Sequence, residues 1–80
     1  MAAQEARIQG EYIGFSFSNL DLSGYVLSGE FIGSNFVGTD LRGAYLNGTF
    51  IGVDFTNANL DDAVLVGNFQ GCTWPKGYVR

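Results

Sequence analysis

The chain has 80 residues, which is enough for one small domain. Hydrophobic residues make up 46% of it and charged residues only 15%, with 12 glycines and one proline. The high content of hydrophobic residues argues against intrinsic disorder, and the dispersed glycines argue against a long helix. The net charge of −4 disfavours direct binding to nucleic acid, which needs clustered lysine and arginine.

The sequence lacks the features of a disulfide-bonded, membrane-spanning or secreted protein. Cys72 is the single cysteine, so a disulfide-stapled scaffold is excluded. No apolar run approaches the roughly 20 residues of a membrane span, and the start MAAQEARIQG lacks the features of a secretory signal. We therefore expect a cytoplasmic protein without membrane association.

A repeat of 19 residues runs through the chain after an expected N-terminal tail, residues 1–5. The first turn, from Glu11, reads EYIGFSFSNLDLSGYVLSG, and the second, from Glu30, reads EFIGSNFVGTDLRGAYLNG. The third, from Thr49, reads TFIGVDFTNANLDDAVLVG, and a partial fourth follows. Such self-similarity predicts a solenoid of about four turns, with one domain over residues 6–80.

Each turn divides into three segments of five residues and one of four. Segments such as VDFTN alternate apolar and polar residues and end in glycine, asparagine or aspartate, which is typical of a short strand followed by a turn. Four such sides, stacked on the next turn at about 4.8 Å, satisfy their backbone groups through their neighbours. The prediction is an all-β fold.

The segments TDLRG, ANLDD, SNFVG and VDFTN share a pattern of a small residue, Asp or Asn, and then Leu or Phe. From about residue 6 to residue 80 the chain resembles the pentapeptide-repeat family. The resemblance implies a right-handed quadrilateral β-helix in which the central Leu or Phe and the residue two before it point inward. The ending CTWPKGY is also similar to a tail common in cyanobacterial members. The implied central residues are Phe17, Leu22, Leu27, Phe36, Leu41, Leu46, Phe55, Leu60 and Leu65, and the small ones are Ser34, Thr39, Ala44, Val53, Ala58 and Ala63.

The two ends of the coil depart from this pattern. The first turn has Phe15, Leu20 and Tyr25 where small residues belong. Because an end coil has no neighbour on one side, we expect these large residues to cap it, and Trp74 with Tyr78 to cap the other end. Cys72 falls in the small inward column, where a packed thiol is expected.

No pattern for catalysis is present. The chain has no histidine, no nucleophile–base pair, no phosphate loop and no cluster of metal ligands. The adjacent Asp61 and Asp62 would point in different directions at a strand end. We therefore expect no enzyme, no cofactor and no metal.

The four-residue side carries adjacent apolar residues. In a strand two neighbours cannot both face inward, so Phe31 and Phe50 are predicted to point in and the following isoleucines out. With outward residues of the adjoining side they would form one apolar strip, a candidate interface. The alternative is a distorted corner with both neighbours half-buried. The predicted strip consists of Ile13, Ile32, Ile51, Val26, Tyr45 and Val64.

Three functions remain open. The leading hypothesis is a non-enzymatic β-solenoid that binds a protein partner, or a second copy, through the apolar edge or a coil end. The resemblance implies an alternative, a DNA-mimicking regulator of DNA gyrase or another type II topoisomerase, because acidic residues repeat at Glu11/Glu30 and Asp21/Asp40. Duplex DNA about 20 Å long carries about twelve charges, so a monomer with eight acids is a poor mimic and an end-to-end dimer a better one. A structural spacer is the third hypothesis.

Overall fold

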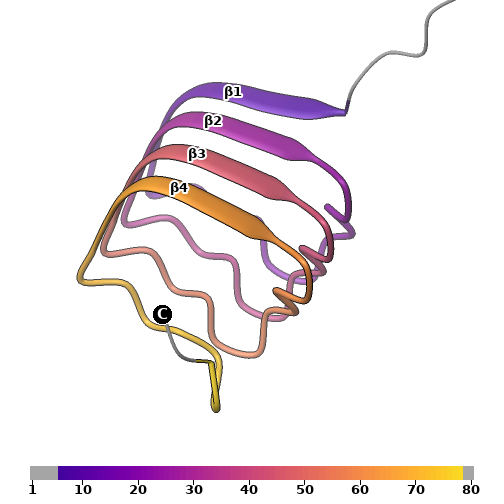
Figure 1. Cartoon of the computed structure of the whole chain (residues 1–80). Helices are drawn as coiled ribbons and strands as arrows, with labels where there is room; N and C mark the ends of the chain where they lie inside the picture. Colours follow the sequence, from indigo (N-terminus) through magenta and orange to yellow (C-terminus); the bar gives the residue numbers. More distant parts are fainter. Residues whose placement is uncertain (1–5, 79–80) are drawn as a thin grey trace, which may run out of the picture.

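Four parallel strands form one wall of a solenoid (Figure 1). The computed structural model describes residues 6–78, so the predicted tail lies outside the described residues. The sheet has the order β1-β2-β3-β4, and every strand pairs with its successor in a constant register. The strands are β1 (Arg7–Ile13), β2 (Val26–Ile32), β3 (Tyr45–Ile51) and β4 (Val64–Gln70).

The other sides of each turn stack through single residues. Isolated parallel bridges join Ser16 to Asn35 and Asn35 to Asp54, and another set joins Asp21 to Asp40. The predicted all-β solenoid with a 19-residue repeat is thus confirmed. Three complete turns separate the start of β1 from the start of β4, and the chain ends within a fourth, so the fold has about three turns rather than four.

The four-residue side is not a strand of its own. It joins the end of the preceding side in one seven-residue strand with a glycine at its centre, at Gly29 in β2 and at Gly48 in β3. These glycines have φ angles of 119° and 145°. A Cβ atom at Gly48 would lie 2.1 Å from the carbonyl oxygen of Gly29, so only glycine allows the coils to approach this closely.

Aromatic side chains stack in two ladders inside the coil. In one, the ring centroids of Phe31 and Phe50 are 4.8 Å apart and those of Phe50 and Phe69 4.7 Å apart. In the other, Phe36 and Phe55 are 5.4 Å apart. The inward leucines fill the remaining space, and the predicted inward orientation of both columns is confirmed in the middle turns. The fully buried members are Leu27, Phe31, Ser34, Phe36, Thr39, Leu41, Ala44, Leu46, Phe50, Val53 and Phe55.

Polar groups of the small inward column bond to the backbone of the preceding turn. The hydroxyl of Ser34 donates to the carbonyl of Tyr12 at 3.0 Å, and that of Thr39 donates to the carbonyl of Phe17 at 2.6 Å. The thiol of Cys72 lies 3.2 Å from the carbonyl of Phe50. Hydrogen bonding removes the penalty of burying these groups, so the column tolerates hydroxyls as well as alanine.

Candidate interaction surfaces

The Asp and Asn residues of the repeat build its turns. The side-chain oxygen of Asn35 accepts the backbone N–H of Val37 at 2.8 Å, and that of Asp54 accepts the N–H of Thr56 at 2.9 Å. The same bond, from the residue two positions on, recurs at Asp21, Asp40 and Asn59. These side chains therefore hold the backbone in the turn that follows.

Hydrogen bonds to three of these carboxylates lower their pKa values. The hydroxyl of Ser23 lowers the pKa of Asp21, and the hydroxyl of Thr56 lowers that of Asp54. The guanidinium of Arg42, 2.7 Å from Asp40, lowers the pKa of that carboxyl. Three of the eight acidic residues thus serve the turns, and one of these three is paired with a cation.

An isoleucine row lies along the C-terminal margin of the sheet, on its outer face. Ile13 pairs with Ile32 and Ile32 with Ile51 in the parallel register. Ile13 is 67% exposed and Ile51 is also exposed, while Ile32 between them is half-buried. The preceding Tyr12, Phe31 and Phe50 point into the coil, so the strand keeps its normal alternation here.

The second predicted group forms a separate row. Val26, Tyr45 and Val64 pair in register at the other end of the strands, six residues before the isoleucines. Six residues of strand span up to about 20 Å, and two columns, led by Gln9 and Glu11 and polar except for Val66, lie between the rows. The six residues therefore do not form the single strip predicted from the sequence. Tyr45 and Val64 are exposed and Val26 is half-buried.

The N-terminal end of the coil presents the enlarged residues of the first turn. Phe15 is 53% exposed, whereas Ser34, its equivalent one turn later, is 1% exposed. The ring of Phe15 meets Tyr12 edge-on with centroids 5.3 Å apart. Leu20 is also exposed, and Tyr25 packs partly against the core. Capping by these side chains stays a prediction.

At the C-terminal end the chain shifts out of register by one residue. The earlier turns close at residues with positive φ, which are Asn19, Gly38 and Asn57. The equivalent position one repeat later is Lys76. Instead Gly77 has φ 84°, and the turn closes with the N–H of Tyr78 donating to the carbonyl of Pro75. Glycine adopts this conformation without strain, so the turn moves to it. The glycine at position 77 is visible in the sequence, but aligning the repeats does not by itself reveal that the turn moves to it.

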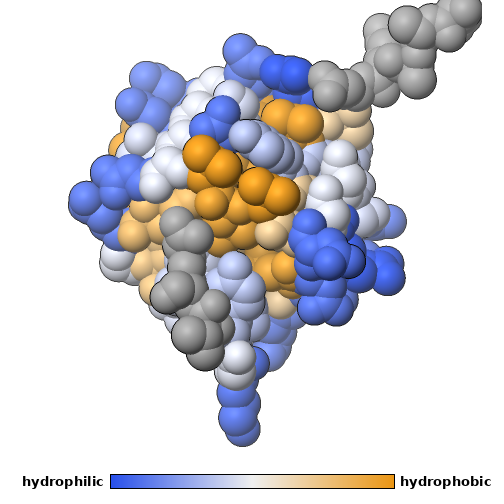
Figure 2. All heavy atoms as spheres, viewed as in Figure 1, coloured by the Kyte–Doolittle hydropathy of each residue, from blue (hydrophilic) through white to orange (hydrophobic). Residues whose placement is uncertain are grey.

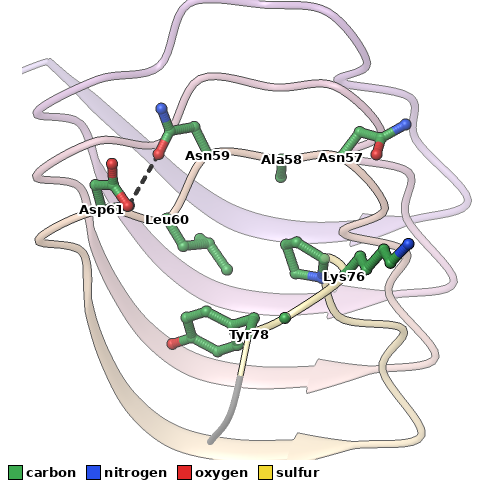
Figure 3. Close-up of a pocket in the computed structure, with 9 residues that line it drawn as sticks. Asn57, Ala58, Asn59, Leu60, Asp61, Lys76 and Tyr78 are labelled. Carbon is green, nitrogen blue, oxygen red and sulfur yellow. Dashed lines mark hydrogen bonds between the residues drawn. The ribbon is translucent and has the colours of Figure 1, made fainter.

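The shifted turn positions the two predicted caps of this end. The indole of Trp74 stacks on Phe55, with ring centroids 5.1 Å apart and planes 4° apart. The ring of Tyr78 stacks on Trp74 at 5.3 Å. The shift also leaves a hollow of about 440 Å³ between the last turns, lined by Ala58 and Leu60 on one side and Tyr78 on the other (Figure 3).

The described residues offer no metal site. Within residues 6–78, no group of three or more His, Cys, Asp or Glu side chains is placed to hold a metal ion. The same part of the chain contains no helix long and apolar enough to cross a membrane.

Stacked five-residue segments with inward Leu or Phe and turn-forming Asp or Asn define the class: the chain is a parallel β-solenoid similar to those of pentapeptide-repeat proteins. The family model for pentapeptide repeats (8 copies) matches residues 30–48, which confirms the resemblance seen in the sequence. No curated protein sequence matches the chain significantly.

Two solved structures similar to this chain are pentapeptide-repeat proteins. One, from the thylakoid lumen of Arabidopsis thaliana, is 22% identical and aligns with 82% of this chain and 54% of its own, with a TM-score of 0.33. The other, Rfr23 from the cyanobacterium Cyanothece 51142, is 20% identical and aligns with 88% of this chain and 61% of its own, with a TM-score of 0.31. The chain thus spans little more than half the length of these proteins.

Proposed function

We propose that this protein is a non-enzymatic β-solenoid that binds a protein partner through the isoleucine row, Ile13, Ile32 and Ile51. The observation that carries the proposal is the exposure of stacked isoleucines on a rigid parallel sheet. Contiguous apolar patches exposed on a surface commonly mark a contact with another protein.

The surroundings of the row suit an interface. The column led by Glu11 and Glu30 runs beside it and gives a polar margin, while Ile13 is the most exposed large hydrophobic residue within residues 6–78. Interfaces commonly combine an apolar centre with a polar rim. The sheet is held by regular hydrogen bonds, so little conformational entropy is lost when a partner docks.

The alternative of DNA mimicry has less support. The carboxylates of Asp21, Asp40 and Asp54 accept hydrogen bonds within their own turns. Arg42 pairs with Asp40 on the same surface. A duplex mimic would need a denser and more continuous line of negative charge.

The test is a double substitution, Ile13→Thr with Ile51→Thr. Threonine is also β-branched and suits a strand, so the fold should persist while the apolar surface is lost. A partner is first recovered from the source lysate with the unmodified protein and then titrated, in purified form, against each variant by calorimetry. We expect at least a ten-fold loss of affinity, equivalent to about 1.4 kcal/mol.

The matched control is Val64→Thr, which removes an exposed β-branched residue from the other row. It should bind the partner normally. Equal affinity of the double variant and the unmodified protein would show that the isoleucine row is not the contact.

A further inference from the structure

We propose that a second copy of this chain docks head to tail on the C-terminal end of the solenoid, with its β1 pairing in parallel with β4 as the next strand of the sheet. β1 and β4 are the edges of the described sheet, at its opposite ends (Figure 1). Exposed strand edges are templates for pairing with another chain. The contact uses the coil ends, and of the isoleucine row of the proposed function only Ile13, the last residue of β1, lies at the junction.

The glycine column selects which strand can follow β4. A Cβ atom at Gly29, Gly48 or Gly67 would lie 2.1 Å from the carbonyl oxygen of the preceding glycine, so each new strand needs glycine opposite the last one. Gly10 meets this requirement in β1. It already has φ 136°, although within residues 6–78 no strand precedes it. β1 therefore carries glycine, already in a suitable conformation, at the position that would lie opposite Gly67 if β1 of the next copy paired with β4.

A hydrogen-bond series points the same way. The N–H of Gly14 donates to the carbonyl of Ile32 at 2.9 Å, and the N–H of Gly33 donates to that of Ile51 at 2.8 Å. Continued across the junction, the series pairs the N–H of Gly71 with the carbonyl of Ile13 in the next copy. Both ends of this series lie at the open coil ends of the described chain.

The hydrophobic ends are complementary. Leu65 and Phe69 are half-buried at the C-terminal end, whereas Leu46 and Phe50 in the preceding turn are fully buried. Figure 2 shows hydrophobic surface gathered in the middle of this face. Val64 and Val66 of β4, the last strand, are also exposed. In the stack Leu65 lies against Ile8 and Phe69 against Tyr12, so the interior columns continue into the next copy.

The enlarged residues of the first turn face the hollow of the last. Leu20 leads the column that continues through Thr39 and Ala58, and Ala58 lines the hollow. The register shift at Gly77 opens this hollow, so it has room for a side chain larger than those in the middle of the coil. The exposed Leu20 of the next copy would fill this space.

Such a contact is heterologous, because each copy keeps a free end after it has paired. Open-ended assembly is the expected consequence. Sedimentation velocity should show a mean mass that rises with protein concentration and reaches no plateau at the dimer.

A charge pair tests the register. In the stack, Asn68 of β4 lies opposite Glu11 of the next copy, whereas within its own chain Asn68 pairs with Thr49. Asn68→Glu should weaken association about two- to five-fold at low ionic strength, and Asn68→Lys should strengthen it by a similar factor. Adding Glu11→Lys to the Asn68→Glu variant should restore association. Asn47→Glu, an exposed change one strand inward, should leave it unaltered.

The proposal is overturned if the unmodified protein stays monomeric to millimolar concentration, or if its mass stops at a dimer. It is also overturned if Glu11→Lys fails to restore the Asn68→Glu variant, because only the head-to-tail register brings these positions together. Ile51→Thr alone, a change in β3 and so one strand away from the junction, should assemble normally even if it weakens binding of the partner, so the failure of one proposal is distinguishable from the failure of the other.

Discussion

At Gly48 the backbone has a φ of 145°, and a Cβ atom would overlap the carbonyl oxygen of Gly29. The neighbouring atom is main chain on the adjacent coil, so it cannot move aside as a flexible side chain could. Gly48→Ala should therefore lower the free energy of unfolding by at least about 3 kcal/mol, through clash and backbone strain together. Urea denaturation followed by circular dichroism measures this change.

Gly43→Ala is the matched control at the same scale. Gly43 also has a positive φ, 67°, but a Cβ there meets no atom within 4 Å. Only the left-handed backbone penalty applies, so the cost should be about 1–2 kcal/mol. If the two variants were equally stable, close approach of the coils would not be what the glycine column provides.

Among the elements, the last turn shows how one residue ends the repeat. In regular turns the N–H of Asn19 donates to the carbonyl of Val37 and that of Gly38 to Thr56. The next bond would run from Asn57 to Pro75, and it does not form among the described residues because the turn closes one residue late. Exchanging the two residues, Lys76→Gly with Gly77→Lys, returns glycine to the repeat position.

The exchanged variant should restore this bond and close the hollow beside Ala58. Amide hydrogen exchange at Asn57 should then slow by about five- to ten-fold, as for one additional hydrogen bond of about 1 kcal/mol. Amides in the middle turns, such as Gly38, serve as internal controls and should not change. Unaltered exchange at Asn57 would mean that the position of glycine does not determine the shift.

The elements differ in how far the sequence predicts them. The inward positions of Phe31 and Phe50 follow from the repeat, because identical residues stack when the coil is regular. The single apolar strip was wrong, because it treated the four-residue side as a separate strand. Val26 and Ile32 lie at opposite ends of one strand, and this depends on the backbone of Gly29, whose φ the pattern of side chains does not reveal.

For the molecule as a whole, the turn carboxylates recur on successive coils. Asp21, Asp40 and Asp54 each accept a backbone N–H and a second hydrogen bond from the residue two positions on. Each coil contacts only its neighbours, so the stability of a solenoid is roughly the sum of its turns and their interfaces. The contributions of these carboxylates to single turns therefore add up in the stability of the whole coil.

This arrangement predicts loss of stability in acid. The folded pKa values of Asp21, Asp40 and Asp54 are lowered, so folding favours the ionised forms. Their contribution is fully present well above the unfolded value of about 3.9 and is lost as the pH falls through it towards the folded values. The urea midpoint should thus be constant near neutrality and decrease below about pH 5.

A triple variant, Asp21→Asn, Asp40→Asn and Asp54→Asn, isolates these three groups. An amide oxygen still accepts the turn N–H, as Asn35 and Asn59 do, but it does not titrate in this range. The variant should lose less stability than the unmodified protein between neutral pH and acid. If both lost the same amount, the acid sensitivity would arise from other carboxylates, and the turns would depend on the hydrogen-bond acceptor alone and not on its charge.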